Sequence, residues 1–188
     1  TVIKLYPQLH KTEPNVIGQY WSYFDDSIVV KADDFTLQGF SINAPEVGDK
    51  AGGTISIIGN NTHLKGNVIG VAVGITGSRS NVAENTLLDD VGVNGSYSTI
   101  SKNVFSGTIR ANGSHLNISS NTKDSSIKIG MDSGIKLEGA FCTIYGNVIT
   151  AKRMTPGIGV DGKDNLVIKN IVENSDVGIR VNGSNNFL

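Results

Sequence analysis

The sequence contains a single cysteine, Cys142, four prolines and few aromatic residues, which make up 6% of its 188 residues. One cysteine excludes an internal disulfide, so the chain is not a small disulfide-stapled scaffold. No apolar run approaches the roughly 18 residues that cross a membrane, and the N-terminal TVIKLYPQLH lacks the charged and apolar segments of a secretory signal. We therefore expect no membrane partner.

Charge of either sign is also in short supply. The 16 Lys and Arg residues and 17 Asp and Glu residues give a formal net charge of −1. Nucleic acids bind basic patches, so we expect no nucleic-acid partner, and recognition by charge must be local. The length suffices for one domain with an apolar core.

What the sequence has in abundance is glycine, with 23 residues, and many of these glycines belong to a repeat. Short apolar stretches end at Gly59, Gly77, Gly95, Gly113, Gly139, Gly162 and Gly183. Eight residues after each of the first six stands an asparagine: Asn67, Asn85, Asn103, Asn121, Asn147 and Asn170. The asparagine spacings are 18, 18, 18, 26 and 23 residues, so the unit is a coil of about 18 residues that accepts insertions.

Each unit predicts three short strands. The residues four and two before the glycine are apolar, as in Ile135 and Leu137, and this period of two predicts a strand with one buried face. A second strand buries the residue three before each asparagine: Leu64, Val82, Ile100, Ile118, Ile144 and Val167. A third buries the residue two after it, where Lys123 is the exception among Ile69, Leu87, Phe105, Ile149 and Val172.

The asparagine column has a physical reason. Asparagine tolerates left-handed turn geometry, and its amide can bond to the next coil, so stacked coils would form a ladder. A degenerate copy of the repeat runs from Ser27 to Ile42, with Ala32 in the glycine position and Phe40 in the asparagine position. We predict an all-β fold, a right-handed parallel β-helix of about seven or eight coils.

The segments GSYSTISKNVFSG and DNLVIKNIVENSDVGIRVNG resemble the right-handed parallel β-helices of the pectin-lyase-like superfamily. That group includes polysaccharide lyases, glycoside hydrolases and phage tailspikes, and the resemblance covers roughly residues 27–188. It implies a polysaccharide partner and an extracellular or virion-associated location. A left-handed hexapeptide helix is the alternative fold, although no six-residue period is visible.

The two ends differ from the repeat. Residues 1–26, which include the aromatic cluster GQYWSYFDDS, are expected to form a leading strand and a capping region, and 27–188 the β-helix. The chain stops five residues after its last glycine, so the terminal coil is expected to be unfinished, with open strand edges. A homotrimer or a longer parent chain would cover that end.

Insertions in a solenoid form loops. In this sequence they follow the third strand and precede the glycine-closed strand, at 43–53, 122–133, 150–156 and 174–176. All should lie along one edge, where they would wall one side of the sheet made by the glycine-closed strands. A walled, elongated groove suits a polymeric ligand.

The outward residues of that sheet carry the charge. One residue before the glycine stand Ile58, Thr76, Asn94, Asn112, Glu138, Asp161 and Asn182; three before it stand Ser56, Gly74, Gly92, Arg110, Lys136, Gly159 and Arg180. Because coils are about 4.8 Å apart, we expect Glu138 beside Asp161 and Lys136 beside Arg110, with Gly159 leaving space for a sugar ring.

A catalytic interpretation assigns Glu138, Asp161 and Lys136 to the reaction. Two carboxylates about 5 Å apart match a retaining glycosidase pair. In β-elimination on a uronate, Lys136 or Arg110 would abstract the proton or stabilise the charge at the reacting carbon. Arg110, Asn112, Arg180 and Asn182 would bind the substrate.

Two further interpretations of these residues remain open. Glu138 and Asp161 could be Ca²⁺ ligands, and no other cofactor is expected. The same charges could also be an ordinary solvated sheet face. Signature motifs do not decide, because neither the Asn-Thr-Asp, Asp-Asp and His-Gly set of polygalacturonases nor the Trp-Ile-Asp-His block of pectate lyases is present.

Three functions therefore compete: an enzyme acting on an anionic glycan, a non-catalytic shaft or glycan-binding module such as part of a tailspike, and a structural solenoid without ligand. Other candidate groups have simpler interpretations. His63 and His115 share no column and are expected to be solvated, and Cys142 takes an inward position, as a buried thiol without function.

Overall fold

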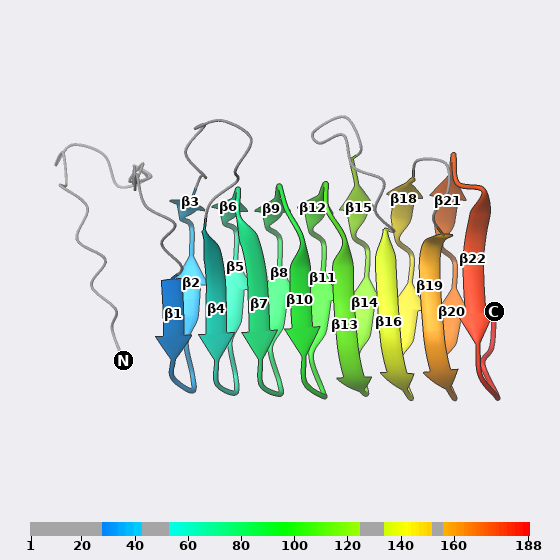
Figure 1. The fold of residues 1–188 in the computed structure, drawn as a ribbon, viewed down its shortest axis with the longest axis horizontal. Coiled ribbons are helices and arrows are strands. Elements are labelled where there is room, and N and C mark those ends of the chain that lie inside the picture. The colour runs from blue at the N-terminus through cyan, green and yellow to red at the C-terminus, as the bar shows by residue number, and fades with distance from the viewer. Residues whose placement is uncertain (1–27, 43–52, 125–133, 152–155) are drawn as a thin grey trace, which may run out of the picture.

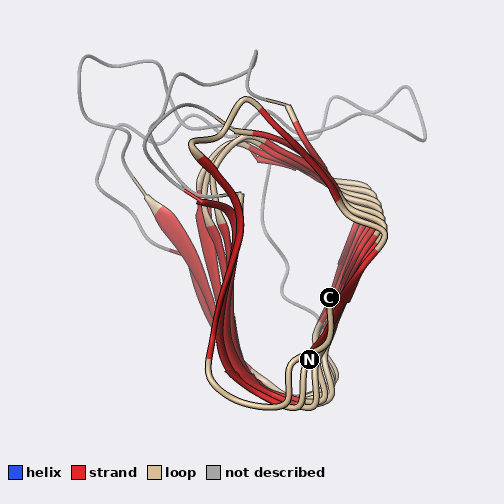
Figure 2. Ribbon diagram, turned by 90° about the vertical axis from the view of Figure 1, so that its right-hand side faces the viewer, coloured by secondary structure: helices blue, strands red, loops and turns tan. Residues whose placement is uncertain are grey.

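The computed structural model describes residues 28–42, 53–124, 134–151 and 156–188. The regular structure in these ranges is entirely β-strand, arranged in three parallel sheets that wind as a right-handed β-helix (Figures 1 and 2). This confirms the predicted fold and its three strands per coil. None of the described residues forms a helix able to span a membrane. The expected leading strand and cap at 1–26 lie outside the described residues.

Each sheet takes one strand from every coil. Sheet A contains β1 (Ile28–Lys31), β4 (Thr54–Ile58), β7 (Ala72–Thr76), β10 (Val91–Asn94), β13 (Ile109–Ser114), β16 (Ile135–Ala140), β19 (Pro156–Lys163) and β22 (Val177–Asn182). Sheet B contains β2 (Thr36–Gln38), β5 (His63–Lys65), β8 (Asn81–Ala83), β11 (Thr99–Ser101), β14 (Asn117–Ser119), β17 (Thr143–Tyr145) and β20 (Leu166–Ile168). Sheet C contains β3 (Ser41–Ile42), β6 (Val68–Ile69), β9 (Thr86–Leu87), β12 (Val104–Phe105), β15 (Thr122–Lys123), β18 (Val148–Thr150) and β21 (Ile171–Glu173).

The register follows the sequence repeat. Ile75 pairs with Val93, which pairs with Ala111, so residues at equal positions of successive units are neighbours. The predicted degenerate copy is the first coil, β1 to β3, and an isolated bridge from Phe187 to Leu166 carries the chain beyond β22 toward sheet B. The extra residues fall between a sheet C strand and the next sheet A strand, as predicted, and most of them lie outside the described ranges. The predicted bounds of two insertions are wrong at their ends, because Thr122 and Lys123 form β15, Thr150 ends β18 and Pro156 begins β19.

The core is the interior of the coil, filled by one or two side chains from each strand. The apolar residues predicted to face inward are buried, except that Val172, Ile179 and Val181 are only partly covered. Lys123 also points inward, with 5% of its surface exposed. Its ammonium group donates to the carbonyl of Gly107 at 2.8 Å, so the charged group ends on a backbone acceptor instead of on apolar atoms.

The asparagine ladder is confirmed. The Nδ2 of Asn103 donates to the carbonyl of Val82 at 2.9 Å and to Oδ1 of Asn121 at 2.9 Å, and the backbone N–H of Asn103 donates to the same Oδ1 at 3.0 Å. The pattern continues from Asn67 to Asn170. In the first coil, the N–H of Phe40 donates to Oδ1 of Asn67, so Phe40 takes the asparagine position without its amide.

One reason given for the ladder is wrong. The asparagines do not adopt the left-handed conformation; the residue before each one does, such as Lys102 at φ 57° and Ser120 at φ 56°. Asparagine recurs at this position of the repeat because its side-chain amide makes buried hydrogen bonds, not because of its backbone freedom.

The closing glycines are explained by close approach between coils. A Cβ built on Gly77 would overlap the carbonyl oxygen of Gly59 in the preceding coil. Any side chain at this position would push adjacent coils apart, and the backbone bonds that join them would lengthen.

We expect Asn103→Ala to lower the free energy of unfolding by about 2–3 kcal/mol, because it removes the amide bonds and leaves the carbonyl of Val82 and the N–H of Asn85 without these partners. Urea unfolding followed by circular dichroism would measure the loss. Asn117→Ala, at an exposed position of β14, is the control and should cost less than about 0.5 kcal/mol. Equal losses of unfolding free energy in the two variants would show that the ladder contributes no more to stability than an exposed asparagine does.

Cys142 is 1% exposed, and burial raises the pKa of its thiol above the usual value. A raised pKa leaves less of the reactive thiolate at a given pH. We expect an aromatic disulfide reagent to label folded protein at least about a hundredfold more slowly than protein in denaturant. Rapid labelling of the folded chain would instead place the thiol at an accessible site.

Candidate functional site

The outer face of sheet A places the predicted charged residues where the sequence indicated. Glu138 on β16 pairs in register with Asp161 on β19, and Arg110 on β13 pairs with Lys136 on β16. The rigid coil-to-coil spacing of a parallel sheet fixes these neighbours. The predicted adjacency of the two carboxyl-bearing residues is thus confirmed at the level of the backbone.

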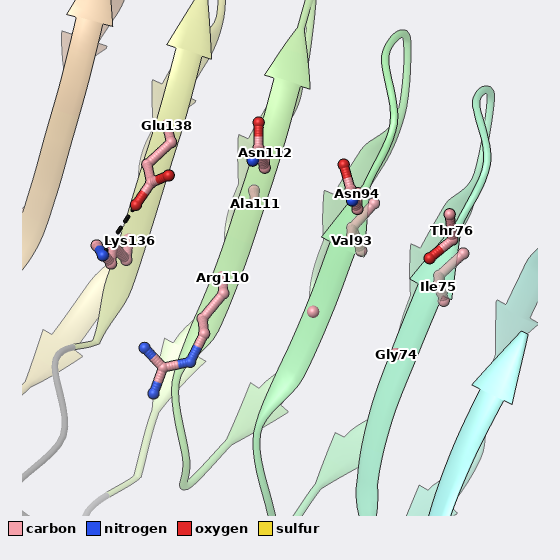
Figure 3. Close-up of a pocket in the computed structure, with 11 residues that line it drawn as sticks. Gly74, Ile75, Thr76, Val93, Asn94, Arg110, Ala111, Asn112, Lys136 and Glu138 are labelled. Atoms are coloured by element: carbon pink, nitrogen blue, oxygen red, sulfur yellow. Dashed lines mark ion pairs between the residues drawn. The ribbon is translucent and has the colours of Figure 1, made fainter.

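The side chains, however, have other partners. Oε1 of Glu138 lies 2.9 Å from Nζ of Lys136, two residues earlier on the same strand (Figure 3). Oδ1 of Asp161 accepts a bond from Nδ2 of Asn182 at 2.7 Å. Each carboxylate therefore has its own donor. A ligand that bound both carboxylates would have to displace Lys136 from Glu138 and Asn182 from Asp161.

Arg110 is held from the coil before it. Its Nη2 lies 3.2 Å from Oδ2 of Asp90, whose Oδ1 accepts the backbone N–H of Thr108 at 2.8 Å. Half of the Arg110 side chain remains exposed, so the ion pair orients the guanidinium without removing it from solvent. Arg180, the other predicted cation, is exposed on β22 in register with Gly159.

A hollow of about 310 Å³ lies on this face. It crosses β7, β10, β13 and β16 (Figure 3), and the outward side chains on it are Thr76, Asn94, Arg110, Asn112, Lys136 and Glu138. Gly74 and Gly92 form its floor, and a Cβ at Gly74 would meet no atom within 4 Å. The hollow therefore exists because two successive coils carry no side chain at this position.

A second hollow of about 520 Å³ adjoins the first. It is lined by residues of β13, β16 and β19 and by Gly183 and Ser184 after β22. Asn112 and Glu138 line both hollows, so the two meet at these residues. Together they cross from β7 to β22, five inter-strand spacings or about 24 Å.

The structure divides the predicted site. Arg110, Asn112, Lys136 and Glu138 come together on the first hollow, whereas Asp161, Arg180 and Asn182 line neither hollow. Gly159 was expected to open space for a sugar ring; a Cβ there would meet no atom within 4 Å, but the residue is buried and lies outside both hollows.

Thr76, Asn94, Gly74 and Gly92 stand in the predicted outward columns but were not expected to belong to the site, because they carry no charge. The useful signal was the pair of consecutive glycines in the column that elsewhere holds Arg110 and Lys136. Two missing side chains on neighbouring coils predict a depression in an otherwise flat sheet.

Glu138 and Asp161 would supply only some of the oxygen ligands of a calcium ion. Ca²⁺ takes six to eight oxygen ligands, often several of them carboxylates. Across the described ranges, no three His, Cys, Asp or Glu side chains come close enough to hold a metal together, and the Glu138 carboxylate is already paired with a cation.

Comparisons with known proteins give no relative from which a function could be transferred. No protein-family model matches the chain, and neither the curated proteins nor the solved structures include a significant match. The chain is a parallel β-helix by its own structure, and its chemistry must be argued from its own residues.

Proposed function

We propose that the chain binds an elongated anionic polysaccharide along the two adjoining hollows on sheet A. The observation that carries this proposal is that the hollows share Asn112 and Glu138 and together extend about 24 Å across the coils. A surface that repeats every coil suits a ligand that also repeats, as solenoids use their long faces to bind extended partners.

The lining groups match the chemistry of such a glycan. The amides of Asn94 and Asn112 can each donate to and accept from sugar hydroxyls. Arg110 and Lys136, in register on adjacent strands, offer two cations to carboxylates of successive acidic sugars. The glycine floor leaves space for a ring to approach the backbone.

The resemblance of the repeat to the pectin-lyase-like superfamily supports the same ligand class. It also favours an extracellular or virion-associated protein. Membership of a homotrimer or of a longer parent chain, as in a tailspike, is compatible with the proposal because sheet A is used along its outer face.

Binding can be tested with a matched pair of lysine variants. Lys136→Met removes a cation from the hollow on sheet A. Lys65→Met removes a cation from sheet B, where Lys65 on β5 is paired with Glu84. We expect Lys136→Met to weaken binding to polygalacturonate or alginate about tenfold and Lys65→Met to leave it unchanged. Affinity electrophoresis in polymer-containing gels would measure both.

The wild-type protein should bind these acidic polymers more weakly as salt rises and should bind neutral dextran little or not at all. Equal retention by acidic and neutral polymers would contradict the anionic part of the proposal. Equal loss of binding in both lysine variants would show that binding follows overall charge, and full binding by Lys136→Met would place the contact outside the hollows.

A second candidate function is cleavage of the bound glycan, favoured by the register pair Glu138 and Asp161. Carboxylates on adjacent strands have a separation near that of a retaining glycosidase pair. In a lyase, the uronate carboxylate would draw Lys136 away from Glu138, and the freed Glu138 carboxylate would accept the proton from the carbon next to the uronate carboxylate. A C=C bond would form as the bond to the glycosidic oxygen breaks, and solvent would protonate that oxygen. Arg110 would stabilise the negative charge on the substrate.

Cleavage predicts new reducing ends, or absorbance of an unsaturated uronate, when the protein is incubated with acidic polysaccharides. Glu138→Gln or Asp161→Asn should lower that rate at least about a hundredfold. Glu84→Gln, which alters the other Lys–Glu pair, is the control and should retain the rate. Retained binding with no product from any polymer would identify a glycan-binding module and exclude the enzyme for this chain.

A further inference from the structure

The turn between sheets A and B carries a column of left-handed residues. At one position in every coil φ lies between 55° and 61°, and we call these residues the turn column: Asp34, Asn61, Arg79, Tyr97, His115, Phe141, Asp164 and Asn185. A backbone bond joins each coil to the next here, such as Tyr97 N–H to the Ser114 carbonyl at 3.0 Å. The column is therefore a straight, evenly spaced row.

Three aromatic rings stack at the centre of this row. The Tyr97 and His115 centroids are 4.7 Å apart and those of His115 and Phe141 are 5.5 Å apart, with nearly parallel planes. Tyr97 is 62% and Phe141 54% exposed. The left-handed conformation disfavours bulky side chains and suits Asn and Asp, which occupy other positions of the same row. The backbone conformation therefore gives no reason for Tyr97 and Phe141, although their stacking on His115 helps to hold successive coils together.

The stack has an opposite charge at each end. Arg79 precedes Tyr97 and Asp164 follows Phe141, one coil away in each direction. Within the described residues, neither side chain makes an ion pair, in contrast to Arg110 and Lys136 on sheet A. The next positions outward, Asn61 and Asn185, are both neutral.

The order of charged, aromatic and neutral residues along the turn column is self-complementary: the column of one copy matches the column of a second copy that runs in the opposite direction. A two-fold axis through His115 and across the row would place Arg79 opposite Asp164 of a second copy, Tyr97 opposite Phe141, and the two neutral asparagines opposite each other. We propose that the turn column is a self-association surface that pairs two copies of the chain antiparallel. The contact is isologous, so one patch serves both partners and closes the dimer.

The same features disfavour a parallel dimer and a sugar ligand at the turn column. A parallel pairing would set Arg79 against Arg79 and Asp164 against Asp164. A sugar stacks on the face of an aromatic ring, but in this row the faces of His115 are covered by its two neighbours. The edges of the rings remain free, and edges pack well against a second set of aromatic side chains.

The contact is narrow, since it follows one turn of each coil. From Arg79 to Asp164 it spans four coil spacings, about 19 Å, which indicates an area below that of standard stable interfaces. The dimer is therefore weak and forms reversibly with rising concentration. Its two exposed ion pairs weaken with added salt.

Charge reversal tests the pairing by sedimentation velocity at concentrations up to the millimolar range. Arg79→Glu and Asp164→Arg should each lower the association constant about 10- to 30-fold, because each turns both attractive pairs of the dimer into repulsive ones. The double variant should recover wild-type association. Glutamate and arginine already adopt the left-handed conformation at Glu84 and Arg79, so the backbone accepts both changes.

Replacing the aromatics separates association from folding. Tyr97→Asn with Phe141→Asn introduces the residue found at Asn61 and Asn185, so we expect the chain to fold as before, with a midpoint lowered at most by the lost ring stacking, together with loss of the dimer. Tyr145→Thr, an exposed aromatic of sheet B outside the row, is the control and should dimerise normally. A wild-type chain that stays monomeric, a trimer, or single reversals without effect would each overturn the proposal.

Discussion

The hydrogen bonds between successive coils are the constraint on which the rest of the structure depends. Parallel strands of two or three residues have too few ladder bonds to hold a sheet by themselves, as in sheet C. The buried asparagine amides add bonds at the corner between sheets B and C, where the chain turns and its backbone groups would otherwise lack partners. With the coils fixed in register, an outward side chain has one determined neighbour on each side.

This fixed register is why much of the backbone arrangement could be predicted from the sequence. The alternation of apolar residues and the constant distance from Gly139 to Asn147 are enough to give strands, corners and the columns on every face. The adjacency of Glu138 and Asp161 followed from counting alone. The backbone of a solenoid follows its repeat, so the repeat in the sequence is enough to predict it.

Side-chain pairing is not visible in the same way. Glu138 has both Asp161 and Lys136 within reach of its column position, and its rotamer selects Lys136 on its own strand. Arg110 turns to Asp90, which belongs to no outward column considered in the sequence. The left-handed corner residue was also misplaced by one position, because the buried amide, not backbone strain, decides where asparagine stands. Rotamers and corner conformations depend on contacts across coils, which a single repeat does not encode.

Among the described residues, the corner between sheets C and A carries no amide ladder, and its left-handed residues, Gly53 and Asn174, are isolated. Coils of 18, 26 and 23 residues share one register because the extra residues lie in this corner, away from the amide ladder and the turn column. Each coil thus has a part of constant length, from its sheet A strand to its sheet C strand, which sets the pitch. The remaining part, from sheet C to the next sheet A strand, varies in length. Evolution, or a protein engineer, can rewrite this variable part to change what stands beside sheet A while the pitch of the solenoid stays the same.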